Sequence, residues 1–272
     1  MTPADRERLI DDLVIVGGSL CSLAQSLTVE EWNTPSPAPG WDVRDQFAHL
    51  ARFDGVAANA LTEPQSFAQI RDALLAESDD VAEMVAQRDR SFAPASVLQN
   101  LVEEDQRLIA ALRHADWDAR VPWFGPPMSV PSCATARLME KFAHGQDIAD
   151  ALGVPQPAMA GLRHIAHLGV RTFGVGFVAR GLPVPTDPVR VVLSVPGDVD
   201  QIAGPPEALN TISGSQLDFC LVVTQRRHHL DTDLRAVGTT AHAWLETAQA
   251  FAGPPGAGRE GSPVSESHRR RP

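Results

Sequence analysis

Apolar side chains recur at helical spacing through most of the first half of the chain. In residues 3–27 they are Leu9, Leu13, Val16, Leu20, Leu23 and Leu27, which predicts an amphipathic helix. Asp42 stands where it can cap a second helix, which runs through His49 to about Leu61. Further helices are expected over residues 67–90, 95–115 and 132–152. The first half therefore predicts a helical bundle.

The pattern changes after Gly153-Val154-Pro155. One more helix is expected over residues 161–180, and a closing helix over 241–251. Residues 189–195 and 219–224 are rich in β-branched side chains and are separated by glycine and proline, which predicts strands. We therefore expect a helical domain over residues 1–155 and a small α+β domain over 156–260. The Gly-, Pro- and Ser-containing residues 261–272 are expected to form a disordered tail.

Length and composition fit a soluble protein of two domains. The chain has 272 residues, of which 43% are hydrophobic and 21% charged. We expect no membrane span, because no apolar run approaches about 20 residues. Residues 1–8 are polar and do not resemble a secretory signal, and the three cysteines are widely spaced, as suits a reducing compartment. Both features predict a cytoplasmic protein.

The charge argues against nucleic acid as a partner. The formal net charge is −11, from 34 acidic and 23 basic residues, whereas phosphate binding needs a positive surface. The basic cluster at residues 268–271 belongs to the expected tail. We therefore expect a small-molecule substrate, no membrane partner, and a monomer or homodimer.

Candidate metal ligands lie on two of the predicted helices. Glu140 and His144 are four residues apart and project from one helix face, which Asp147 shares. Most such pairs are simply solvated side chains. His49 lies in an apolar stretch, where a lone histidine is more often part of the core. Together, however, these residues suit a metal site, since facing helices of a bundle direct side chains into a shared interior.

The order of these motifs resembles a known family. Trp32-x-x-Pro35, Gly40-Trp41-x-Val43 and His49-Leu50, followed by Glu140-x-x-x-His144-x-x-Asp147, resemble the mycothiol-dependent maleylpyruvate isomerase family of DinB/YfiT-like metalloenzymes. Residues 218–228 and 248–259 resemble a subgroup known mainly for metal binding. The resemblance covers about residues 5–260. It implies a DinB-like four-helix bundle followed by a small α+β, sterol-carrier-like domain.

The resemblance also implies a mechanism. His49, Glu140 and His144 would hold one divalent ion, usually zinc, with a fourth position open. In the isomerase that position is implied to take the thiolate of mycothiol, whose sulfur adds to a conjugated double bond, permits rotation and leaves again. We expect a zinc-dependent isomerase or S-transferase for a small, unsaturated, carboxylate-bearing electrophile. Two alternatives stay open: a metal-dependent hydrolase or lyase without a thiol, and a non-catalytic binding protein.

Five further residues are candidates around this site. Asp147 is expected to act in catalysis by orienting His144 or a substrate group, or else to be a surface carboxylate. Arg226 and Arg227 suit a substrate carboxylate, with Arg227 also catalytic, although salt bridges would explain them equally well. Trp123 and Met128 are expected to line the substrate pocket, or simply to pack against the bundle.

Overall fold

The computed structural model describes residues 1–78, 81–156, 159–251, 253, 255–256 and 258–261. It divides into two compact units, Met1–Gly161 and Leu162–Pro272. The predicted disordered tail falls, from residue 262 onward, outside the described residues.

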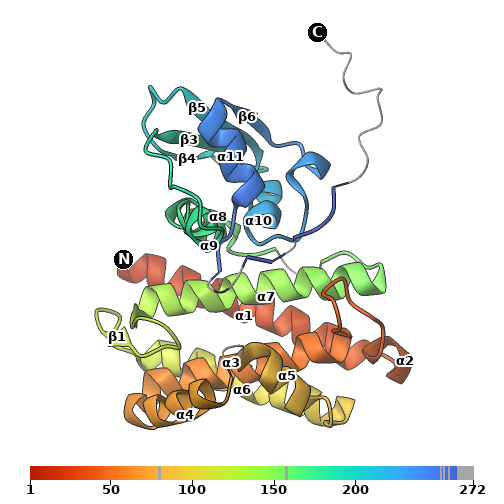
Figure 1. Cartoon of the computed structure of the whole chain (residues 1–272). Coiled ribbons are helices and arrows are strands. Elements are labelled where there is room, and N and C mark those ends of the chain that lie inside the picture. The colour runs from red at the N-terminus through yellow and green to blue at the C-terminus, as the bar shows by residue number, and fades with distance from the viewer. Residues whose placement is uncertain (79–80, 157–158, 252, 254, 257, 262–272) are drawn as a thin grey trace. The chain divides into compact units, whose positions relative to one another are not determined.

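Four long helices form the first unit. They are α1 (Pro3–Ser26), α3 (Val43–Thr62), α6 (Pro94–His114) and α7 (Val130–Leu152), and α1 and α3 each pack on both α6 and α7 (Figure 1). Thr2, Asp42 and Ser129 cap α1, α3 and α7 by accepting a hydrogen bond from a backbone N–H of the first turn. The caps therefore fix where the helices begin, and the apolar stripes fix which faces meet.

Shorter elements complete this unit. They are α2 (Val29–Trp32), α4 (Pro64–Glu77), α5 (Val81–Asp89) and the paired strands β1 (Arg120–Val121) and β2 (Met128–Ser129). The single helix expected over residues 67–90 is therefore two helices. The first ends where Ser78 adopts an extended backbone, and serine competes with helix formation by bonding to nearby backbone groups.

Four charged side chains form an ion cluster inside the bundle. Asp54 of α3 accepts hydrogen bonds from Arg137 Nε, at 2.9 Å, and from Lys141 Nζ, and Lys141 also binds Asp105 of α6 at 2.9 Å. Gly17 of α1 makes room for this cluster, because a Cβ there would lie 2.1 Å from Oδ1 of Asp105. Burial opposes the charge of Lys141, but Asp54 and Asp105 raise its pKa above the usual value. The cluster thus joins three of the four long helices by ion pairs.

The second unit contains a four-stranded mixed sheet. Its strands have the order β4-β3-β5-β6, in which β3 and β5 are parallel and the outer pairs antiparallel. Helix α10 packs on α8, β3 and β5, and α11 packs on β5, β6 and α9. The elements are α8 (Leu162–Arg171), α9 (Val175–Ala179), β3 (Val189–Ser194), β4 (Gln201–Ala203), β5 (Asn210–Ser215), α10 (Gln216–Val223), the 3-10 helix η1 (His229–Asp231), β6 (Arg235–Val237) and α11 (Thr239–Thr247).

The strand predicted over residues 219–224 is wrong, because this segment belongs to helix α10. Ser215 caps the helix by accepting a hydrogen bond from the backbone N–H of Asp218. The apolar residues that follow are buried on all sides. A short, fully apolar run has no periodicity that separates a buried helix from a buried strand.

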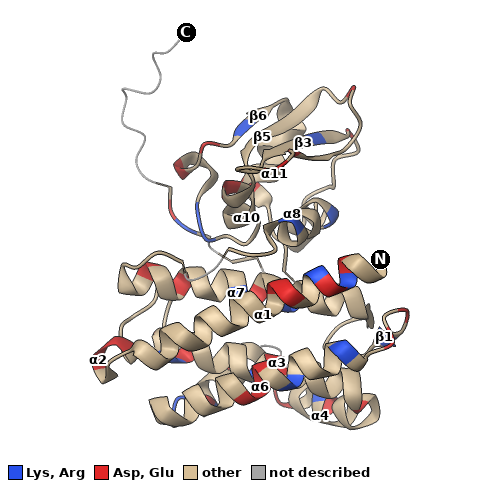
Figure 2. Cartoon of the chain, turned by 180° about the vertical axis from the view of Figure 1, so that it is seen from behind, with Lys and Arg blue, Asp and Glu red and all other residues tan. Residues whose placement is uncertain are grey.

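Helix α1 is long and apolar enough to cross a membrane by length and composition alone, with a mean hydropathy of 1.3 in its most apolar window. The absence of a continuous apolar run of about 20 residues did not reveal this property. Core helices of bundles share it, and Leu9, Leu13 and Leu20 of α1 are buried in the bundle. Figure 2 shows acidic and basic positions interspersed along the helices of this unit. The absence of membrane and nucleic-acid partners stays a prediction.

Candidate metal centre

Helices α3 and α7 bring the three predicted ligands together. His49 Nε2 lies 3.5 Å from Glu140 Oε2, and His144 Nε2 lies 3.1 Å from the same oxygen. One donor atom from each residue falls within 4.8 Å of the other two. The three side chains keep exposures of 10%, 24% and 12%, so a solvent-borne ligand can reach them.

A hydrogen-bond chain orients His144. Its Nδ1 donates to Oε1 of Gln46, which lies one turn before His49 on α3. Nε2 of Gln46 in turn donates to Oγ of Ser36 at 2.8 Å, and this hydroxyl donates to the carbonyl of Trp41 at 2.9 Å. Because Nδ1 is engaged by Gln46, Nε2 is the nitrogen that faces Glu140. Such outer hydrogen bonds are typical of histidines that bind metals.

The protonation states suit cation binding. Burial and the neighbouring His144 lower the pKa of His49 to about 4, so this imidazole is neutral at pH 7 and offers a lone pair. Burial opposes ionisation of Glu140, but hydrogen bonds from His144 and His49 hold its pKa well below the usual value. A neutral imidazole and an ionised carboxylate are the forms in which these residues bind metal ions.

Aromatic rings surround the histidines. The indole of Trp41 lies 5.3 Å from the ring of His49 and 6.0 Å from that of His144, stacked on the latter at 21°. Phe53 packs on His49 at 4.6 Å. The rings continue to Phe124, 6.0 Å from Phe53, and to Trp123, 5.6 Å from Phe124. Apolar surroundings of this kind limit water and strengthen electrostatic interactions.

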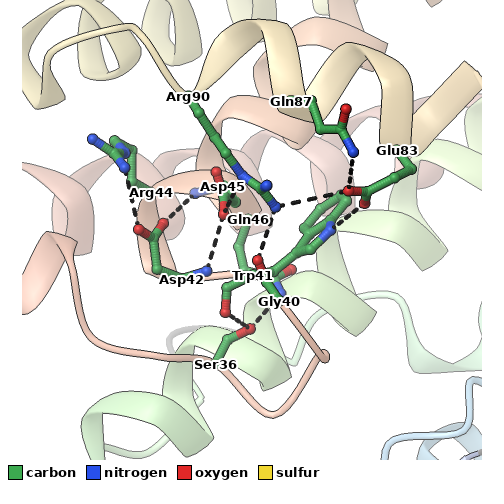
Figure 3. A network of polar contacts seen from close by, with 10 residues as sticks. All are labelled: Ser36, Gly40, Trp41, Asp42, Arg44, Asp45, Gln46, Glu83, Gln87 and Arg90. Atoms are coloured by element: carbon green, nitrogen blue, oxygen red, sulfur yellow. Dashed lines mark hydrogen bonds and ion pairs between the residues drawn. The ribbon is translucent and has the colours of Figure 1, made fainter.

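A polar network fixes Trp41 from outside the cluster (Figure 3). Its Nε1–H donates to Glu83 of α5 at 2.9 Å. Arg90 lies 3.8 Å from Glu83 and donates to the carbonyl of Gly40 at 2.8 Å and to Asp45 at 3.4 Å. Gly40 has φ +79°, a left-handed conformation that glycine adopts without strain. Both the backbone and the ring of Trp41 are therefore held in place.

Trp123 and Asp147, two of the other predicted site residues, lie in the same unit as the cluster. Trp123 is joined to it by the row of rings, and it also stacks on Phe67 at 6.0 Å. Asp147 is buried on α7, but the partner of His144 Nδ1 is Gln46. Catalysis by Asp147 and substrate binding by Trp123 stay predictions.

Met128, also expected at the substrate pocket, pairs with Val121 in the β1–β2 hairpin. Its side chain is half-buried. Its substrate-binding role stays a prediction.

Arg226 and Arg227 lie in the second unit, directly after α10. Arg227 lines a small cavity of about 140 Å³ together with Arg180, His228 and Arg259. Gln225, just before them, has φ +61°, and strain of this kind often marks functional sites. Binding of a substrate carboxylate by these arginines stays a prediction.

A cavity of about 500 Å³ in the first unit does not include the three ligands. It lies between α3, α4, α5 and α6 and is lined by residues such as Ala48, Val56, Ile70 and Phe92. The donor chemistry, rather than cavity size, therefore identifies the candidate site.

Sequence reasoning missed Gln46, Phe53 and Glu83. Gln46 and Phe53 precede and follow His49 by one helical turn, and this spacing is the signal that places them on its face. Glu83 gave no comparable signal, because its contact with Trp41 spans 42 residues of sequence.

These features define a class of protein: a four-helix bundle with a His–Glu–His cluster between two of its helices, followed by a smaller α+β unit. The family described as "Mycothiol maleylpyruvate isomerase N-terminal domain" matches residues 17–149. The chain belongs to the mycothiol-dependent maleylpyruvate isomerase family.

Two relatives and two solved structures match most of the chain. Uncharacterised proteins from two strains of Mycobacterium tuberculosis are 42% identical over 256 residues, which cover 94% of this chain and 100% of theirs. Crystal structures of the mycothiol-dependent maleylpyruvate isomerase and of a histidine-to-alanine mutant of it are similar to this chain, with TM-scores of 0.57 and 0.58. Their identity is 15%, covering 85% of this chain and 92% of theirs. The predicted family and the mostly helical two-part fold are thus confirmed, and the sterol-carrier-like character of the second unit stays a prediction.

Proposed function

We propose that this chain is a zinc-dependent enzyme of the mycothiol-dependent isomerase or S-transferase type. Its substrate would be a small unsaturated electrophile that carries a carboxylate. The observation that carries the proposal is the convergence of His49, Glu140 and His144 in a domain of this family. The isomerases with this fold are named for mycothiol and maleylpyruvate, so these are the first cofactor and substrate to test.

The residues present fit a divalent ion. Two imidazole nitrogens and one carboxylate oxygen form a donor set that zinc accepts, with one position left for another ligand. Nε2 of His144 and Nε2 of His49 lie near the same oxygen of Glu140. A shared cation would bind these three atoms, and its binding would release the protons that the ligands carry. When bound, the ion would stabilise the thiolate form of a thiol cofactor at neutral pH.

Each neighbouring residue has a proposed task. Gln46 keeps Nε2 of His144 directed at the cluster, and Trp41 and Phe53 limit the access of water to it. Trp123 and Met128 would contact the apolar part of the substrate, and Asp147 would orient a polar group.

Arg227, with Arg226, would hold the substrate carboxylate through charge-assisted hydrogen bonds. Two planar guanidinium groups match the geometry of a carboxylate.

Arg227→Ala should separate substrate binding from metal and thiol binding. We expect the KM for maleylpyruvate to rise about tenfold or more, because a hydrogen bond to a charged group contributes about 1.5–3 kcal/mol. Zinc content and mycothiol affinity should stay unchanged. The measurement is the steady-state kinetics of the zinc-loaded protein with mycothiol, with Arg235→Ala, an exposed arginine of β6, as the matched control.

Two outcomes would contradict this account. If Arg227→Ala leaves the KM unchanged, the arginine does not bind the carboxylate. If mycothiol supports no turnover of maleylpyruvate or related unsaturated acids, while water-dependent hydrolysis or elimination proceeds without it, the hydrolase or lyase alternative replaces the thiol-dependent enzyme.

A further inference from the structure

The two histidines of the cluster are oriented in different ways. Nδ1 of His144 donates to Gln46, which is the usual arrangement for a metal-binding histidine. Among the described residues, no hydrogen bond reaches Nδ1 of His49. Its ring instead packs on Trp41, at 5.3 Å, and on Phe53, at 4.6 Å. Ring packing therefore takes the place of the missing hydrogen bond.

Trp41 can hold a ring in place only if it is itself held. Its indole is the single ring in contact with both histidines among the described residues. Its Nε1–H bonds to Glu83, whose carboxylate also accepts from Gln87 at 3.1 Å and faces Arg90 (Figure 3). An indole N–H makes a stronger hydrogen bond to an ionised carboxylate than to a neutral acceptor. The bond to Trp41 is the largest cause that lowers the pKa of Glu83, so this carboxylate stays ionised at pH 7.

We propose that Trp41 is a positioning residue of the metal centre and that Glu83 of α5 is the group that holds it. The inference rests on the proposed metal site and concerns two residues that are not among its ligands. Arg90, which directly follows α5, also binds Gly40 and Asp45 and so ties the end of α5 to the start of α3 and the loop before it. The orientation of His49 thus depends on a carboxylate that contacts neither the ion nor the substrate.

Zinc affinity tests this directly. Glu83→Ala should weaken zinc binding about tenfold or more, the range found when outer partners of metal ligands are removed. Glu83→Gln should restore most of the affinity, because its amide oxygen can still accept from the indole. The matched control is Glu77→Ala, which removes an exposed carboxylate paired with Arg88 and leaves Trp41 untouched. Competition with a chromophoric chelator measures all four proteins.

Two further readouts separate positioning from general stability. The indole Nε1–H resonance of Trp41, assigned by its loss in Trp41→Phe, should move further from its wild-type position in Glu83→Ala than in Glu83→Gln, because glutamine keeps an acceptor for the indole. The metal-free Glu83→Ala protein should melt within about 4 °C of metal-free Glu77→Ala. Each variant loses one exposed ion pair, and Glu83→Ala loses in addition only the hydrogen bonds from Trp41 and Gln87, a net loss of about 1 kcal/mol.

The proposal is overturned if Glu83→Ala binds zinc within twofold of the wild type, or if the Trp41 resonance is unchanged in that variant. Equal loss of affinity in Glu77→Ala would overturn it as well. A wild-type chain that binds no zinc would contradict both the proposed function and this inference, whereas tight wild-type binding with an unaffected Glu83→Ala variant contradicts the inference alone.

Discussion

The double substitution His49→Ala/His144→Ala should reduce bound zinc from about one ion per chain to nearly none. Glu140 would be the last of the three donors, and a single carboxylate offers too few ligands for tight binding. Elemental analysis of protein dialysed against trace zinc measures the loss. Because neither histidine belongs to the ion cluster of the core, the variant should keep its helical content.

The matched control is His164→Ala/His167→Ala. These histidines are three residues apart on α8, a spacing that imitates a ligand pair. Their removal should leave zinc content unchanged. Full metal retention in the His49/His144 variant would refute the ligand assignment, and loss in the control would relocate the site to the second unit.

Asp54→Ala should lower the free energy of unfolding more than any other substitution that we propose. Of the described carboxylates paired with the buried Arg137 and Lys141, the substitution leaves only Asp105. Removing one partner of a buried ion pair destabilises a protein by about 3–5 kcal/mol. Urea unfolding followed by circular dichroism measures the change, and Asp72→Ala, which removes an exposed partner of Arg71, should change stability by less than about 0.5 kcal/mol.

Lys141 offers a second, site-specific measurement, because it is the only lysine of the sequence. In the folded wild-type protein an amine-reactive reagent should label the α-amino group and spare this buried side chain. In Asp54→Ala, labelling at Lys141 should rise with the population of opened molecules. Equal protection of Lys141 in both proteins, together with equal stability, would show that the ion cluster contributes nothing to the bundle.

The bundle and two of the three candidate ligands could be predicted from local sequence patterns. Apolar periodicity gave the four long helices, and Asp42 gave the start of α3. The spacing of Glu140 and His144 put both side chains on one helix face. Glu140 and His144, however, point to His49 as a third ligand only if α3 packs against α7. The family resemblance implied that packing.

Features that depend on tertiary contact could not be predicted in this way. The segment that forms α10 has the composition of a strand, and only burial on all sides and the cap at Ser215 make it helical. The bond between Trp41 and Glu83 joins residues that no periodicity relates. Asp54 pairs with Arg137, which lies 83 residues away in the sequence. This ion pair can be recognised only from the packing of the helices.

The most direct test of the central claim is the absorption spectrum of the cobalt-substituted protein titrated with mycothiol. If His49, Glu140 and His144 leave a coordination position that a thiolate can take, a sulfur-to-cobalt charge-transfer band should appear in the near ultraviolet. The band should persist in Arg227→Ala and be absent from His49→Ala/His144→Ala. A spectrum that excess mycothiol leaves unchanged, in protein shown to contain one cobalt ion per chain, would contradict the account.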